Sequence, residues 1–201
     1  MEIYSLKLKS KTNANVFICS TDNGEFTLHS DIIVKDKIEK GSVEDGIFYN
    51  AVEESEILIG FNLCVKYISN KLKTEKQIKD YLYKKEYHKP AVEEIIAKLK
   101  EYNIINDELY AQTYARTKAN LSKNRIKQKL LSFGVKNEVS NDAVEEMDDY
   151  SSCLNNANKY MRNKVADKQT IEKLIRRLQG MGYNWDAIKH TLNVLKCELE
   201  E

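Results

Sequence analysis

Residues 104–135, IINDELYAQTYARTKANLSKNRIKQKLLSFGV, contain two helical patterns that are separated by a short polar break. The first pattern is entered through Asn106-Asp107, and Ser122, a good N-cap residue, begins the second. Gly134 follows the second pattern, where glycine permits the left-handed backbone that often ends a helix. Versions of this arrangement stand before and after the stretch, so the sequence predicts a repeated helical unit.

The repeat becomes visible when three N-cap candidates are aligned. Thr74, Ser122 and Thr170 follow one another at intervals of 48 residues. Apolar residues recur at one phase after each of them, and a small residue stands three positions before a tyrosine in each preceding helix, which places both on one face. These residues, which we expect in the core, are Ile78, Ile126 and Leu174, then Leu82, Leu130 and Leu178, and the pairs Cys64–Tyr67, Ala111–Tyr114 and Ala157–Tyr160.

The pattern predicts a mainly α fold of three tandem three-helix modules, and such modules stack into an elongated, curved body. An N-terminal extension with a small β-sheet and short helices precedes them, over residues 1–52. The expected helices are 55–72, 74–86 and 90–102 in module 1 (53–102), 107–119, 122–133 and 137–148 in module 2 (103–148), and 151–165, 170–181 and 185–199 in module 3 (149–201).

The N-terminal extension has the pattern of a small antiparallel sheet. Apolar and polar residues alternate at its start, and Asp22-Asn23-Gly24 is a turn signal, so residues 2–28 predict two or three strands. Ser30 or Asp31 is expected to cap a short helix that runs through Lys37, and Lys40-Gly41-Ser42 is expected to end it and to start another.

Charge is distributed unevenly in a chain whose formal net charge is only +1. Residues 66–136 hold 17 basic and 8 acidic side chains, a net of +9, whereas residues 137–150 hold six acidic and no basic ones. A basic middle permits contact with a polyanion, although a solvated helix face gives the same count.

The four cysteines are far apart and form no CxxC pair, which favours free thiols in a reducing compartment. The longest apolar run, residues 57–61, is much too short to span a bilayer. We therefore expect a soluble cytoplasmic protein without membrane contact.

Sequence motifs of catalysis are missing: there is no P-loop, HExxH or GxSxG pattern. Gly180-Met181-Gly182 stands at a helix end, where it is expected to act as a cap and not as a dinucleotide loop. The histidines are isolated from one another and from cysteine. We expect no enzymatic activity, no cofactor and no metal site.

Basic side chains remain as candidates for contact with DNA or a DNA-bound protein filament. They cluster near the first interhelix turn, at the start of the central helix and in the third module, and could follow a phosphate backbone if several share a face. Lys127 and Lys129 are two apart and cannot share one helix face. The candidates are Lys84, Lys85, Lys118, Lys123, Arg125, Lys127, Lys129, Arg162, Lys164, Arg176 and Arg177.

The order of these motifs resembles the RecX family of bacterial recombination regulators. The resemblance rests on Ala-x-x-Tyr-x-Arg at residues 111–116 after Ile-Ile-Asn-Asp-Glu at 104–108, on the helix starts at Thr74 and Ser122, and on Lys-Tyr-Ile-Ser at 66–69. It covers about residues 50–199, and the first 50 residues are similar to the N-terminal extension of some members.

The resemblance implies a function and a partner. Members of the family bind the RecA recombinase filament on single-stranded DNA, lodge in its helical groove, and restrain its ATPase, growth and strand exchange in DNA repair, recombination and SOS control. Some bind DNA themselves. A monomer that inhibits RecA is therefore the leading hypothesis. A helical DNA-binding protein that acts without recombinase, and a helical-repeat scaffold for another protein, are the alternatives.

Two positions depart from the family pattern. Glu86 and Asn103 stand where members often have glycine, at the end of a helix in the first module and before the Asn-Asp turn. Asparagine tolerates the left-handed conformation, whereas Glu86 suggests a different cap.

Overall fold

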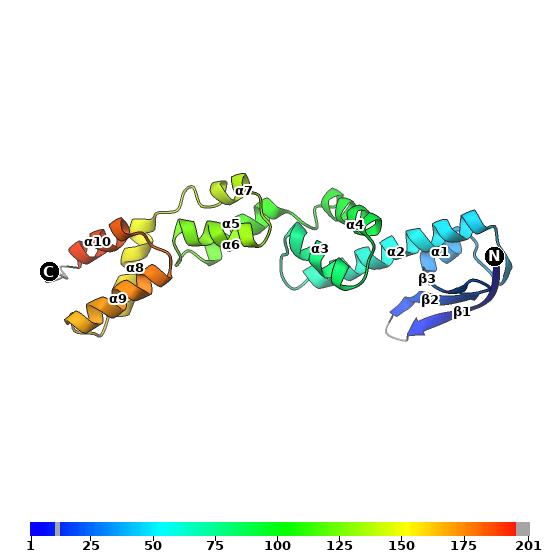
Figure 1. Ribbon diagram of the computed structural model, residues 1–201, viewed down its shortest axis with the longest axis horizontal. Coiled ribbons are helices and arrows are strands. Elements are labelled where there is room, and N and C mark those ends of the chain that lie inside the picture. The colour runs from blue at the N-terminus through cyan, green and yellow to red at the C-terminus, as the bar shows by residue number, and fades with distance from the viewer. Residues whose placement is uncertain (11–12, 196–201) are drawn as a thin grey trace. The chain divides into compact units, whose positions relative to one another are not determined.

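The structure is a computed structural model that describes residues 1–10 and 13–195. It is mainly helical, with one small sheet near the N-terminus (Figure 1), as the sequence predicts. The chain divides into two compact units, the first over Met1–Ile105 and the second from Asn106 onward. Each unit contains two clusters of buried side chains.

The sheet of the first unit has four antiparallel strands in the order β3-β2-β1-β4. Leu6, Cys19 and Phe26 are partners across the three long strands and point into one core. The predicted turn before β3 is present, with Gly24 at φ +119°, and the two-residue β4 adds a fourth strand to the two or three that were predicted. The strands are β1 Glu2–Ser10, β2 Asn13–Thr21, β3 Gly24–His29 and β4 Gly41–Ser42.

Helix α1 (Ser30–Lys35) is capped differently from the prediction. Its N-cap is His29, whose Nδ1 accepts a hydrogen bond from the Asp31 backbone N–H at 3.2 Å. Neither Ser30 nor Asp31 is the cap, because the strand that precedes the helix ends only at His29.

Helix α2 (Asp45–Ile68) begins ten residues before the predicted start at residue 55. Its first half carries Phe48 and Ala51 into the core of the sheet, and its second half carries Cys64 and Ile68 into the next core. The predicted division between residues 52 and 53 therefore falls within one continuous helix. The sequence predicts a separate short helix after Ser42 and does not predict that it continues into the helix expected from residue 55.

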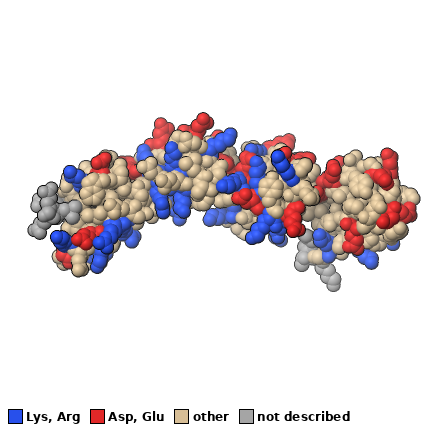
Figure 2. Space-filling model, in the orientation of Figure 1, with Lys and Arg blue, Asp and Glu red and all other residues tan. Residues whose placement is uncertain are grey.

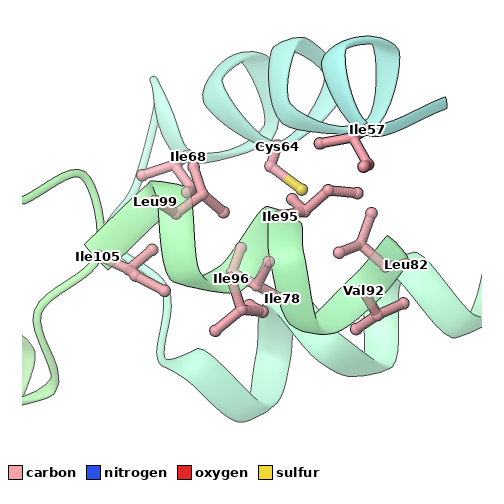
Figure 3. Close-up of a cluster of buried hydrophobic side chains, with 10 residues drawn as sticks. All are labelled: Ile57, Cys64, Ile68, Ile78, Leu82, Val92, Ile95, Ile96, Leu99 and Ile105. Atoms are coloured by element: carbon pink, nitrogen blue, oxygen red, sulfur yellow. The ribbon is translucent and has the colours of Figure 1, made fainter. Parts of the chain in front are cut away.

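Helices α3 (Glu75–Lys84) and α4 (Lys89–Glu101) complete the first unit around a core of aliphatic side chains (Figure 3). Ile78, Leu82 and Leu99 are fully buried there. Thr74 forms the predicted capping box: its Oγ1 accepts from the Gln77 backbone N–H, and the Gln77 side chain accepts from the Thr74 N–H.

The second unit contains two groups of three helices, each with its own core. Ile126 and Leu130 are fully buried in one group, and Leu174 and Leu178 in the other, as the repeat predicts. The helices are α5 Asp107–Thr117, α6 Lys123–Ser132, α7 Asn137–Asp142, α8 Asp149–Met161, α9 Lys168–Gly180 and α10 Trp185–Val194.

Several helix boundaries in this unit differ from the prediction, among them those of α8, which spans Asp149–Met161 instead of 151–165. Asp167, not Thr170, is the N-cap of α9, and its Oδ1 accepts from the Thr170 N–H at 2.7 Å. Helix α7 ends at Asp142 instead of 148, because the acidic residues that follow would stand at the negative end of its dipole. Helix α10 ends at Val194, and the predicted residues 196–199 lie outside the described part of the chain.

Residues with a left-handed backbone conformation stand just after the ends of several helices. Gly134 and Gly182 have φ of 87° and 88°, as expected, and Asn103 has φ of 53°. Glu86 also adopts the left-handed conformation, with φ of 65°. The expectation of a different cap at Glu86 is therefore wrong. The helix ends in the same left-handed turn as with glycine, although this backbone conformation is strained for a residue that has a Cβ.

Candidate functional site

The candidate basic residues fall into separate groups on the two units. Lys84 is the last residue of α3 and Lys85 its C-cap, both exposed, in the first unit. The other nine belong to the second unit, around α6 or around the end of α8 and α9. Figure 2 shows Lys and Arg side chains gathered over both of these regions.

Around α6, one of the candidate basic residues forms hydrogen bonds within the protein. Lys123 donates its backbone N–H to Asp149 Oδ1 at 2.9 Å and its Nζ to the Glu145 carbonyl at 2.8 Å. Lys127, one turn later, is also half-buried, whereas Arg125 and Lys129 are exposed. Lys118 is the C-cap of α5 and is exposed as well. Lys123 therefore has a structural role, and Lys118, Arg125 and Lys129 are the more accessible cations.

The end of α8, the residues that follow it and the last turn of α9 bring a basic group together around Tyr160. The Lys164 Nζ lies 3.1 Å and the Arg177 guanidinium carbon 5.8 Å from the centroid of the Tyr160 ring. Cations over a tyrosine face are attracted by the ring quadrupole, which holds both side chains near one place. An open depression of about 530 Å³ lies beside them, lined by Asn156, Lys159, Tyr160, Arg162, Asn163, Lys164 and Arg177. We call this the Tyr160 depression.

Arg176 is the candidate that the structure removes from this group. It lies on α9 next to Arg177 but forms an ion pair with Glu172 one turn earlier, at 3.7 Å, and it does not line the depression. Lys159 and Asn163, by contrast, were not among the candidates. The i, i+4 spacing of Tyr160 and Lys164 could have indicated a ring that is only partly core.

A second depression in this unit, of about 420 Å³, has the opposite character. Arg116, from the motif that resembles RecX, lies with Asp142, Glu145 and Glu146 among its lining residues. Asp142 ends α7, Glu145 and Glu146 belong to the turn that follows, and all three lie beside residues of α5 in this depression. Acidic and basic surfaces therefore occur on one compact unit.

A hydrogen-bonded joint connects the two helix groups of the second unit. Ser122 donates its Oγ–H to the Gly182 carbonyl at 2.6 Å and its N–H to the Met181 carbonyl at 3.1 Å. The Tyr183 hydroxyl donates to the Asn120 carbonyl at 3.2 Å, and the Asn156 amide donates to that carbonyl and to the Tyr183 oxygen. Burial raises the pKa of Tyr183, so the hydroxyl stays neutral.

The three cysteines in the described part of the chain are buried. The Cys19, Cys64 and Cys153 thiols lie in the cores, and burial raises their pKa, for Cys64 to about 12. Within residues 1–10 and 13–195, no three His, Cys, Asp or Glu side chains stand close enough to hold a metal ion. In the same part of the chain, no helix combines the length and apolarity needed to cross a membrane.

The fold and these surfaces define a helical protein built from repeated three-helix groups, with charged faces suited to binding. Comparison with known proteins points to a particular family. Residues 61–99 match the model of the first three-helix domain of RecX. Regulatory protein RecX of Listeria monocytogenes serotype 4b (strain CLIP80459) is 29% identical over 205 residues, covering 98% of this chain and 76% of the relative.

Other relatives and solved structures agree. Regulatory protein RecX of Clostridioides difficile (strain 630) is 29% identical over 202 residues, covering 96% of this chain and 95% of that one. A crystal structure of regulatory protein RecX matches with a TM-score of 0.66 at 19% identity, over 98% of this chain and 99% of the other. RecX from Lactobacillus salivarius matches with a TM-score of 0.62 at 26% identity, over 71% of this chain and 98% of that one.

The resemblance to the RecX family is thus confirmed, and so is the mainly helical fold with a small N-terminal sheet. These relatives are named as regulators and not as enzymes, in agreement with the expectation of a regulatory protein without catalytic activity.

Proposed function

We propose that this protein binds the RecA recombinase filament on single-stranded DNA and inhibits its ATPase, growth and strand exchange. It would act in the cytoplasm, as a monomer, in DNA repair, recombination and SOS control. The observation that carries the proposal is similarity to regulatory proteins RecX over nearly the whole chain.

The surfaces of the second unit support this function. A filament on DNA presents both protein and phosphate, and the Tyr160 depression is basic while the depression at Arg116 is mostly acidic. Such a modulator needs no covalent chemistry, because a ligand shifts a conformational equilibrium by its differential affinity for the two states. The division into an extension, residues 1–52, and modules 53–102, 103–148 and 149–201 remains part of the proposal, with α2 joining the first two.

The test is DNA-dependent ATP hydrolysis and strand exchange by the cognate recombinase as the protein is added. Both rates are expected to fall as the protein approaches stoichiometry with the filament. Unchanged rates of ATP hydrolysis and strand exchange at stoichiometric amounts of the protein would contradict the proposal.

A second candidate function is DNA binding without recombinase, which the gathered cations of α8 and α9 favour. It predicts tight, salt-sensitive binding to bare DNA and no dependence of that binding on RecA. Weak binding to bare DNA together with inhibition of the recombinase would exclude this candidate in favour of the first. A scaffold for some other protein would be indicated by a pull-down that captures a partner but no recombinase.

A further inference from the structure

We propose that the Tyr160 depression is a binding site for the phosphate groups of single-stranded nucleic acid. The site consists of Lys159, Arg162, Lys164 and Arg177, arranged around the Tyr160 ring. The inference deepens the proposed function and rests on it, because it assigns the nucleic-acid contact to one surface of the third helix group.

The charge of the depression is the first observation. Four of the side chains that line it are cationic and two are amides, and none of its described lining residues is acidic. Elsewhere on the described surface, lysines and arginines are often paired, as Arg176 is with Glu172 and Lys98 with Glu94. Like charges repel, so four cations at one place that form no ion pair with another described residue favour an anionic ligand.

The geometry of the group is the second observation. Tyr160 is half-buried and packs against the core of its helix group, which fixes the position of its ring. Lys164 and Arg177 lie over that ring, so their conformational freedom is already reduced before a ligand binds. Arg162 is the C-cap of α8 and therefore stands on defined backbone.

The openness of the depression indicates a polymer. The cations are exposed, so a small anion placed there would exchange little of its hydration for protein contacts. A nucleic-acid backbone carries one charge per nucleotide along a continuous chain, and its binding releases condensed counterions. Arginine forks match phosphate oxygens in pairs, and a tyrosine beside them offers a surface for a sugar or base.

The experiment uses the full chain and a fluorescein-labelled oligodeoxythymidylate, without recombinase, followed by fluorescence anisotropy across a range of salt concentrations. In the variant R162Q/R177Q, affinity is expected to fall by about threefold or more, and the salt slope by roughly 0.7 for each phosphate that the variant no longer neutralises. K159Q is a further variant in the same lining and is expected to act in the same direction.

The single variants R177Q and R176Q form the matched pair, because each removes one positive charge from α9 and only Arg177 lines the depression. R176Q is the control. It is expected to bind the oligonucleotide like the parent chain. The proposal is overturned if the parent chain does not bind, if R162Q/R177Q binds like the parent, or if R176Q loses as much affinity. Circular dichroism establishes that each variant is folded, and the exposed positions are expected to tolerate glutamine.

Recombinase assays separate this inference from the proposed function. If R162Q/R177Q binds the oligonucleotide normally but no longer inhibits ATP hydrolysis, the depression contacts an acidic protein surface, and the phosphate site is overturned. If the parent chain binds through the depression but leaves recombinase activity unchanged, the phosphate site stands and the proposed function fails.

Discussion

At the scale of single residues, the left-handed positions after helices show most directly why a particular amino acid is needed. Gly182 has φ of 88°, and a Cβ built there would lie 2.7 Å from both Ser122 Oγ and Arg125 Cβ. Glycine is therefore needed at this position for two reasons: it adopts the left-handed backbone conformation, and it lets the two helix groups approach closely.

Replacement of Gly182 by alanine is expected to destabilise the second unit by about 1–3 kcal/mol, from backbone strain and from the contact with Ser122. Urea denaturation measures the change. Gly180→Ala is the control, because the last residue of α9 has open space at its Cβ, so alanine should be neutral or stabilising by up to about 1 kcal/mol. Equal effects of the two variants would contradict the close approach.

Glu86 leads to the opposite expectation. Its φ of 65° is strained for a residue with a Cβ, so Glu86→Gly should stabilise the first unit by roughly 1 kcal/mol. Thermal unfolding followed by circular dichroism tests this. Lys85→Gly, at a residue with φ of −93°, should give no gain, and a gain there would point to an effect of glycine unrelated to the turn.

At the scale of elements, most helices could be predicted because apolar spacing and caps agree. Thr74 and Ser122 are N-caps as expected, but at α9 a carboxylate three residues earlier takes the role that the 48-residue interval assigned to Thr170. Periodicity places a helix face and not its first residue, since the cap depends on which side chain reaches the free N–H groups.

Removal of the Thr74 cap is expected to cost about 1 kcal/mol of unfolding free energy, as for other N-cap Thr→Ala changes. Thr170→Ala should cost distinctly less, because alanine retains the backbone N–H that Asp167 accepts and loses only the hydrogen bond from the hydroxyl to that carboxylate. The two changes are compared by denaturation of the full chain. A larger loss for Thr170→Ala would show that the repeat, and not the Asp167 cap, describes α9 correctly.

The Asp167 cap also predicts a dependence on pH. Hydrogen bonds from the Thr170 backbone and side chain lower the pKa of Asp167 below its ordinary value of 3.8. A carboxylate with a lowered pKa in the folded state stabilises above its unfolded pKa and loses this contribution as pH falls through the folded one. Asp167→Asn should therefore flatten the loss of stability in the acid range, and an unchanged pH profile would contradict the cap.

At the scale of the whole molecule, two features of the structure could not be predicted from sequence patterns. The continuity of α2 was not predicted, because its first half packs Phe48 and Ala51 against the N-terminal sheet whereas its second half packs in the next core. The Tyr160 depression was found only in part, since Arg162, Lys164 and Arg177 were expected but Lys159 was not, and Arg176 is held by Glu172. Tertiary packing decides which cations lie close together, and a count of charges along the sequence gives no information about that packing.

The two compact units should respond separately to core substitutions. Leu130 is fully buried in the second unit, so Leu130→Ala should cost roughly 2–5 kcal/mol there. Hydrogen exchange should become faster in the second unit while α3 and α4 keep their protection. Ile78→Ala, in the core of the first unit, should give the reverse pattern, and faster exchange in both units from either change would contradict their independence.

The most direct measurement of the central proposal is co-sedimentation of the protein with recombinase filaments assembled on single-stranded DNA. Saturable pelleting with the filament, in excess of pelleting with the same DNA alone, is the predicted result. A protein that stays in the supernatant with the filament, or that pellets equally with bare DNA, would contradict a regulator of the RecA filament.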